Sequence, residues 1–171
     1  MKIVGLVAVK ANSKRFPGKN LYKHKGFPLF FHSVKPLIES TLVDEVYVIT
    51  NTAPAGAGYK IIWRPKNASR DEDKLINVLR FGYYRLDEEY DAVVTIMANC
   101  PGHTVNSVDS AIILLKDKKL KEVRSFNKAG EESGLMVFSK TLMEVNSDIS
   151  YYMGGIVSDV KEIHYKEDLD E

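Results

Sequence analysis

Three short, nearly continuous apolar runs constrain the fold of this chain most, and they lie at residues 3–9, 46–50 and 92–97. They are rich in β-branched side chains and show no strict alternation with polar residues. Such runs are typical of strands that are buried on both faces, as in the centre of a parallel sheet. The sequence therefore predicts three central strands of one sheet.

A helical pattern follows each run, with apolar side chains repeating at helical spacing over 30–38, 75–86 and 105–115. Pro36 should kink or shorten the first helix. A capping box at 69–72 is expected before the second helix, and Thr104 is the expected N-cap of the third. Strand followed by helix, three times over, predicts a layered α/β fold with right-handed crossovers.

The rest of the chain is less regular. We expect short strands at 122–126 and 135–138, a helical turn at 140–145 and a last strand at 155–160. A length of 171 residues predicts a single domain, 1–171. No apolar run is long enough for a membrane span and the start lacks a signal peptide's apolar region, so a cytoplasmic protein without membrane contact is expected. Cys100 is the only cysteine, which excludes an internal disulfide.

Charge is distributed unevenly along the chain. Eight Lys and Arg residues precede the first acidic residue, Glu39, whereas the segment from Asp159 onward is mainly acidic. This asymmetry indicates an anion site near the N-terminus, although a solvated basic face is an equally good interpretation of the charge alone. Nucleic-acid binding ranks last, because neither aromatic platforms nor a recognised motif accompany the cations.

The segment 10–20 follows the first apolar run and combines small residues with four cations, Lys10, Lys14, Arg15 and Lys19. Ligands of open α/β sheets bind at the carboxyl ends of strands, which is where this segment should lie. Small residues let backbone amides approach phosphate oxygens, and the cations offset the phosphate charge. The segment is neither a Walker A loop nor a dinucleotide fingerprint. It predicts a polyphosphate site of another kind.

The same segment resembles the signature of the acylneuraminate cytidylyltransferases, a family that includes the 3-deoxy-manno-octulosonate cytidylyltransferases. The signature normally opens with Arg where this chain has Lys. Weaker similarity continues at 64–71, 97–101, 133–138 and 162–169. The matching positions of the strong part are Lys10, Ser13, Lys14, Pro17, Gly18, Lys19, Asn20, Leu21, Gly26, Pro28 and Leu29.

This resemblance implies a Rossmann-like three-layer α/β fold of the nucleotide-diphospho-sugar transferase type, with a mostly parallel central sheet. It implies transfer of CMP from CTP to a sialic-acid-like sugar acid or a similar acceptor, with release of pyrophosphate, and the family's dimers raise the expectation of a homodimer. The implied catalytic cations are Lys10, Lys14 and Lys19. The implied nucleotide-binding residues are Ala11, Asn12, Ser13, Arg15, Asn20, Arg64, Ser69 and Asn99.

The metal positions depart from the family. Mg²⁺ prefers anionic oxygen ligands, and the family's metal carboxylates correspond here to Asn99, Glu162 and His164. Glu162 keeps a carboxylate and is the predicted metal ligand, with Asp159 as a substitute. Mg²⁺ is therefore expected as the cofactor, with an incomplete ligand set. The segment 139–155 is also too short for the element that dimerises and covers the sugar in the family.

Two other functions fit the same residues. The substituted metal positions also fit a catalytically impaired homologue that binds a nucleotide and acts as a regulator or scaffold. Basic loops of this kind also serve sugar nucleotidyltransferases that use UTP, GTP or ATP. Tight binding of CTP without turnover would indicate the first function, and preferential thermal stabilisation by another triphosphate would indicate the second.

Overall fold

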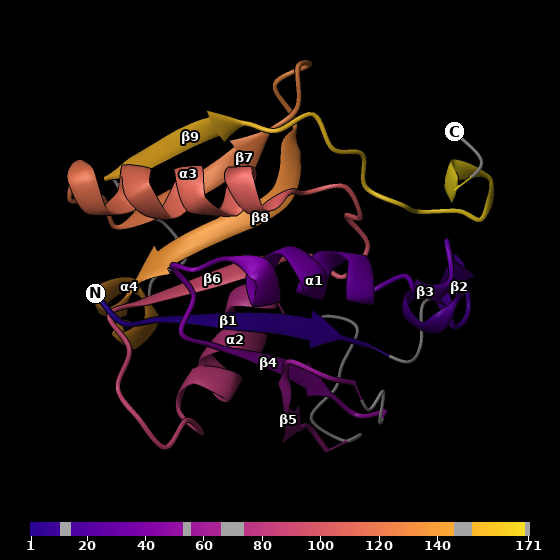
Figure 1. The fold of residues 1–171 in the computed structure, drawn as a ribbon, viewed down its shortest axis with the longest axis horizontal. Helices are drawn as coiled ribbons and strands as arrows, with labels where there is room; N and C mark the ends of the chain where they lie inside the picture. Colours follow the sequence, from indigo (N-terminus) through magenta and orange to yellow (C-terminus); the bar gives the residue numbers. More distant parts are fainter. Residues whose placement is uncertain (11–14, 53–55, 66–73, 146–151, 170–171) are drawn as a thin grey trace.

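A seven-stranded sheet forms the centre of the computed structural model, with the strand order β5–β4–β1–β6–β8–β7–β9 (Figure 1). The structure describes residues 1–10, 15–52, 56–65, 74–145 and 152–169. Strand β8 runs antiparallel to both of its neighbours, whereas the other pairings in the sheet are parallel. The expected α/β fold with a mostly parallel central sheet is confirmed.

The three predicted central strands are present and lie next to one another. Strand β1 (Ile3–Val9) pairs in parallel with β4 (Glu45–Thr50) and with β6 (Ala92–Ile96). All five residues of β6 are buried, and β1 is buried except at Ala8. Neighbouring strands flank β1 on both edges and helices cover both of its faces, which explains its continuous apolar run.

Strand β5 (Lys60–Trp63) was not predicted. It extends the sheet beyond β4 in parallel, and three of its four residues are exposed. Because an edge strand is only partly covered, it lacks the long apolar run that marks β1 and β6.

The second half of the sheet contains β7 (Glu122–Phe126), β8 (Glu132–Ser139) and β9 (Met153–Val157). The last strand was predicted at 155–160. Strand β9 starts two residues earlier than this prediction and ends three residues earlier. Its register explains the difference, since Glu122 pairs with Met153 and Phe126 pairs with Val157. Strand β9 is therefore as long as the β7 edge that it pairs with.

Helices cover both faces of the sheet and complete the three layers. Helices α1 (Phe31–Glu39) and α3 (Val105–Asp117) pack on one face, where they share a hydrophobic cluster (Figure 1). Helices α2 (Leu75–Tyr83) and α4 (Lys140–Glu144) contribute to a second cluster on the other face. Each helix buries its apolar stripe against the sheet, which is the packing expected for a layered α/β fold.

The helix starts follow the sequence signals in part. The Thr104 side chain accepts from the Ser107 backbone amide at 3.3 Å, and the Ser107 hydroxyl accepts from the Thr104 amide at 2.9 Å, so Thr104 is confirmed as an N-cap. Pro36 lies inside α1, which nevertheless continues to Glu39. The capping box predicted at 69–72 lies outside the described residues.

A small hairpin at the carboxyl end of β1 was not predicted. Strands β2 (Lys23–His24) and β3 (Phe27–Pro28) pair across Lys25 and Gly26, whose φ angles are 46° and 90°. Positive φ at both turn residues is the geometry of a tight two-residue hairpin. The C-terminal segment runs back from β9 toward this hairpin (Figure 1). None of the helices in the described part of the chain has the length and apolar character required to cross a bilayer.

Candidate functional site

The candidate site lies where the C-terminal segment meets the carboxyl ends of β1 and β6. Asn99 follows β6 and is nearly buried. Its carbonyl accepts the backbone N–H of Ile163 at 2.8 Å, and its Nδ2 donates to the Ile163 carbonyl at 3.0 Å. These two hydrogen bonds fix the C-terminal segment to the end of the central strand.

Lys19 reaches the same point from the basic loop. Its Nζ donates to the Ile163 carbonyl at 2.7 Å, across 144 positions of sequence. Partial burial of the ammonium lowers the pKa of Lys19, and the nearby Glu162 carboxylate opposes this effect. A single carbonyl oxygen thus accepts from both predicted nucleotide-site residues, Lys19 and Asn99.

Glu162 and His164 flank Ile163 and belong to one chain of polar contacts. The Glu162 Oε1 accepts from Asn99 Nδ2 at 2.7 Å, and its Oε2 lies 3.5 Å from His164 Nε2. The other ring nitrogen of His164, Nδ1, lies 3.2 Å from the Arg15 guanidinium. Because Arg can only donate, this contact assigns Nδ1 as the acceptor and places the imidazole proton on Nε2.

Asp168 fixes the backbone of this segment. One of its carboxylate oxygens accepts the backbone N–H groups of His164 and Tyr165, each at 2.8 Å. The other oxygen lies 3.4 Å from Lys161 Nζ. These hydrogen bonds favour the charged form and hold the pKa of Asp168 below its usual value. Asp168 therefore positions His164, and its negative charge also favours the charged form of Lys19.

Asn20 closes the base of the basic loop. Its Nδ2 donates to the Lys10 carbonyl at 3.0 Å, and its own carbonyl accepts the backbone N–H of Phe30. Its Oδ1 is buried and finds no hydrogen-bond partner among the described residues. Asn20 thus joins the end of β1 to the start of α1.

Arg64 lies at the next strand end. It follows β5, is buried, and its backbone N–H donates to the Thr50 carbonyl at the end of β4 at 2.8 Å. Asn51 is the residue that follows β4, and its Oδ1 is also buried without a hydrogen-bond partner among the described residues. Arg64 therefore lies at the same edge of the sheet as Asn99, on the side of β4 and β5.

The structure brings five of the predicted site residues together, and the roles assigned to all the predicted site residues stay predictions. Lys19, Asn99 and Glu162 converge on the Ile163 segment, Arg15 joins them through His164, and Asn20 holds the base of the loop. The predicted residues Ala11, Asn12, Ser13, Lys14 and Ser69 lie outside the described residues.

Two contributors were missed as site residues from the sequence, the Ile163 carbonyl and His164. His164 was considered there as a poor replacement for a metal carboxylate and was not placed among the predicted site residues. The similarity of 162–169 to the family's terminal segment was the available signal for both residues, because it suggests that this segment reaches the site.

The described residues hold no cluster of several protein ligands for a divalent ion. In the described part of the chain no three His, Cys, Asp or Glu side chains lie close enough to hold a metal ion. Asp159, the expected substitute, pairs with Lys128 at 3.0 Å. Glu162 supplies the one carboxylate beside Asn99, and both of its oxygens face nitrogen atoms of neighbouring side chains. Mg²⁺ is usually held by one or two carboxylates together with substrate phosphates, and Glu162 is the one such carboxylate that the described residues place beside Asn99.

Cys100 and His103 have structural positions. Cys100 is 1% exposed, and burial raises the pKa of its thiol to about 12, so no thiolate is available near neutral pH. His103 Nε2 donates to the Ser133 carbonyl at 2.7 Å, and its Nδ1 accepts from the Ser158 hydroxyl at 3.0 Å. His103 therefore ties the start of α3 to the second half of the sheet.

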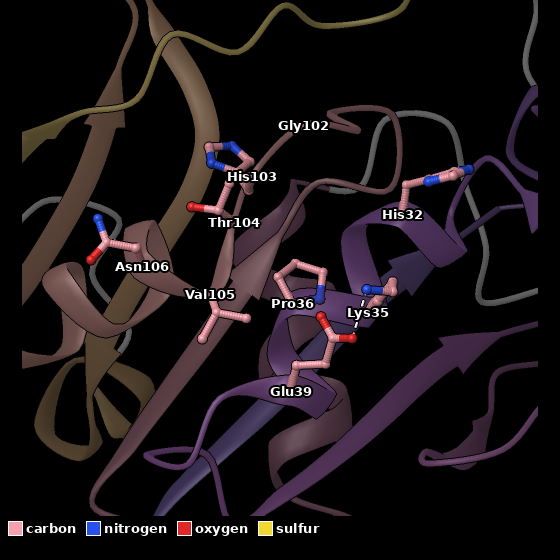
Figure 2. A pocket seen from close by; sticks show the side chains of 9 residues that line it. All are labelled: His32, Lys35, Pro36, Glu39, Gly102, His103, Thr104, Val105 and Asn106. Atoms are coloured by element: carbon pink, nitrogen blue, oxygen red, sulfur yellow. Dashed lines mark hydrogen bonds and ion pairs between the residues drawn. The ribbon is translucent and has the colours of Figure 1, made fainter. Parts of the chain in front are cut away.

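Two pockets border these elements. One of about 460 Å³ lies between α1 and the start of α3, with the Lys35–Glu39 ion pair on its wall (Figure 2). The other, of about 320 Å³, has Ile163 and Asp168 in its wall and so adjoins the candidate site. Gly102 belongs to the walls of both.

Comparison with known proteins gives consistent results. A family model described as cytidylyltransferase matches residues 4–153. The 3-deoxy-manno-octulosonate cytidylyltransferase of Bdellovibrio bacteriovorus is 30% identical over 126 residues, 70% of this chain and 49% of that protein. The CMP-N,N'-diacetyllegionaminic acid synthase of Legionella pneumophila is 25% identical over 125 residues, 68% of this chain and 54% of that protein. The chain thus spans about half the length of these two relatives.

Solved structures show the same fold. CMP:2-keto-3-deoxy-manno-octonic acid synthetase in complex with CTP superposes with a TM-score of 0.81 at 13% identity, covering 99% of this chain and 96% of that one. A Mycobacterium tuberculosis protein in complex with manganese has a TM-score of 0.68 at 13% identity, covering 92% and 89%. The fold is that of nucleotide-diphospho-sugar transferases, and a divalent metal accompanies at least one structure that shares it.

Proposed function

Because the chain belongs to the cytidylyltransferase family, we propose that it transfers CMP from CTP to an acidic, hydroxyl-bearing acceptor of the sugar-acid class. The acceptor oxygen attacks the α-phosphorus and forms a new P–O bond. The bond from the α-phosphorus to the bridging oxygen breaks, pyrophosphate leaves with the electron pair, and the hydroxyl proton is released. Such a step depends on positioning and on neutralising phosphate charge more than on covalent catalysis.

The observation that carries this proposal is the convergence of loop cations and strand-end amides at one place. Lys19 and Asn99 both donate to the Ile163 carbonyl, which is an oxygen acceptor as a phosphate oxygen is. A phosphate that reached this place would meet donors already aligned, and preorganised donors are the main resource for stabilising charge in phosphoryl transfer. The Lys19 ammonium has two N–H donors besides the one that Ile163 accepts, so we expect a phosphate oxygen to bind beside the Ile163 carbonyl.

Each candidate residue has a proposed role. The cations Lys10, Lys14 and Lys19 offset charge on the transferring phosphates. The other nucleotide-site residues bind phosphate, ribose or base, and they are Ala11, Asn12, Ser13, Arg15, Asn20, Arg64, Ser69 and Asn99. Arg64 and Ser69 are assigned to the base.

The proposed acceptor class is supported by the relatives, whose names specify diacetyllegionaminic acid and 3-deoxy-manno-octulosonate. An acidic acceptor also agrees with the basic character of the loop. A homodimer and a cytoplasmic location stay predictions from the sequence.

The test is release of pyrophosphate from CTP. We expect release in the presence of a divalent cation and at least one acid from a panel of sialic-acid-like and octulosonate sugars. Thermal shifts with CTP, UTP, GTP and ATP should rank CTP first, because a ligand that binds only the folded state raises the melting temperature. A larger shift with another triphosphate would assign the enzyme to a different nucleotide.

A second candidate function is nucleotide binding without turnover. Asn99 and His164 stand where the family resemblance implies metal carboxylates, and this substitution favours a regulator or scaffold. Calorimetric binding of CTP without pyrophosphate release from any acceptor would support this function. Absence of CTP binding would refute both.

A further inference from the structure

The charges around Glu162 lack the excess of negative charge that would attract a metal ion. Glu162 and Asp168 contribute two formal negative charges near Lys19, and Lys19 and Arg15 contribute two positive ones. His164 lies between Arg15 and Glu162, with Nδ1 3.2 Å from the Arg15 guanidinium and Nε2 3.5 Å from Glu162 Oε2. A divalent cation placed beside Glu162 would therefore meet two cationic side chains, which repel it.

The oxygen atoms that a metal would need are also engaged. Glu162 Oε1 accepts from Asn99 Nδ2, and Asp168 is occupied by two backbone N–H groups and Lys161. Asp159 is paired with Lys128. Asn99 turns its amide nitrogen toward Glu162 and Ile163, so the donor atoms at the heart of the site are N–H groups. Nitrogen-bound protons bind anions, not metal ions.

We propose that Arg15 and Lys19 take the charge-neutralising role that a protein-held divalent ion would have, so that this chain binds the nucleotide phosphates without a metal site of its own. The inference rests on the proposed function, because it concerns the nucleotide assigned to this site. The ligand of this site is a polyphosphate that is bound by the Arg15 guanidinium and the Lys19 ammonium. A divalent ion that takes part would be held by the nucleotide phosphates and would supply further charge neutralisation there.

The first experiment uses Mn²⁺ alone as the probe, because its binding is measured by electron paramagnetic resonance without nucleotide or turnover. The wild-type chain should show no saturable Mn²⁺ site below about 1 mM. The double variant Asn99→Asp/His164→Asp restores two carboxylates beside Glu162 and should tighten Mn²⁺ binding by about tenfold or more, since added anionic oxygens strengthen such a site. Asn106→Asp, an exposed position at the start of α3, adds a carboxylate elsewhere and should change nothing.

Saturable Mn²⁺ binding by the wild type at micromolar concentration would overturn the proposal. If the double variant fails to fold, as judged by circular dichroism, Asn99→Asp alone replaces it, and the wild-type titration remains decisive. If a folded carboxylate variant binds Mn²⁺ no more tightly than the wild type, this result would also contradict the proposal. It would mean that the side chains at positions 99 and 164 do not cause the weak Mn²⁺ binding of the wild type.

The second experiment measures CTP affinity by calorimetry in EDTA and in Mg²⁺. The affinities should agree within about threefold, whereas a loss of about tenfold or more in EDTA would show that the protein needs the ion to hold phosphate. Failure of CTP to bind in either buffer refutes the proposed function. The Mn²⁺ titration still decides whether the chain has a metal site, so the two failures are distinguishable.

Discussion

Replacing Lys19 with Met removes one ammonium from the candidate site and leaves most of the side-chain stem. In the wild type the ammonium is half-buried and donates to the Ile163 carbonyl at 2.7 Å. The same carbonyl also accepts from Asn99 Nδ2 at 3.0 Å, so it keeps a donor in the variant. The C-terminal segment should therefore stay in place.

The magnitudes follow from these contacts. A hydrogen bond to a charged group contributes about 1.5–3 kcal/mol, and removing the desolvated ammonium offsets part of that loss, so we expect the free energy of unfolding to fall by about 1 kcal/mol. Phosphate binding loses one charge-assisted contact without such an offset. The affinity for CTP should fall by about 10- to 100-fold, since each 1.4 kcal/mol is about tenfold.

Isothermal calorimetry with CTP and thermal unfolding measure the two effects separately. Lys23→Met is the matched control, because Lys23 is exposed on β2 and carries the same charge in the same part of the chain. The control should lose less than about threefold in affinity, as expected for a screened charge at the surface. Equal losses in the two variants, or no loss in Lys19→Met, would refute the role assigned to the Lys19 ammonium.

Three further predictions concern the surroundings of the site. Gly134→Ala should destabilise the fold by about 2–4 kcal/mol in urea denaturation, because φ is 90° there and a Cβ would lie 2.5 Å from the Cys100 sulfur; a change below about 0.5 kcal/mol would contradict this packing argument. The Cys100 thiol should react with a thiol reagent only as fast as the chain opens, since it is buried and its pKa is raised to about 12, and rapid labelling of the folded protein would show that it is accessible. Asp168 has a pKa lowered from 3.8 in the folded state, so its stabilising effect is full above that pH and is lost as the pH falls through the lower, folded value. Asp168→Asn should therefore reduce the acid dependence of the melting temperature below about pH 4, and an unchanged profile would mean that the carboxylate does not act this way.

The part of the fold that was predictable is the part buried on both faces. Strands β1, β4 and β6 have continuous apolar runs because neighbours and helices enclose them. Strand β5 and the β2–β3 hairpin are exposed or very short, and their pairing depends on backbone hydrogen bonds that leave little trace in side-chain pattern. The antiparallel direction of β8 was likewise not predictable, since hydrophobic pattern does not specify strand direction.

The candidate site divides in a similar way. The cations Lys19 and Arg15 stood out because they follow a buried strand in a loop of small residues. The contact of Arg15 with His164 spans 149 positions, and the acceptor for Lys19 is a backbone carbonyl, which every residue has. Composition and spacing cannot reveal such a partner. The fold has to bring the two ends of the chain together first.

The oxygen of Ile163 has a consequence for the order in which this protein is made. The ribosome delivers Lys19 at a point 144 positions before Ile163, and chains generally begin to fold from the N-terminus while synthesis continues. Lys19 and Asn99 must therefore wait for their shared acceptor until strands β1 to β9 have all been synthesised. A nascent chain arrested between β9 and Ile163 would have every strand of the sheet and no acceptor to join Lys19 to the end of β6.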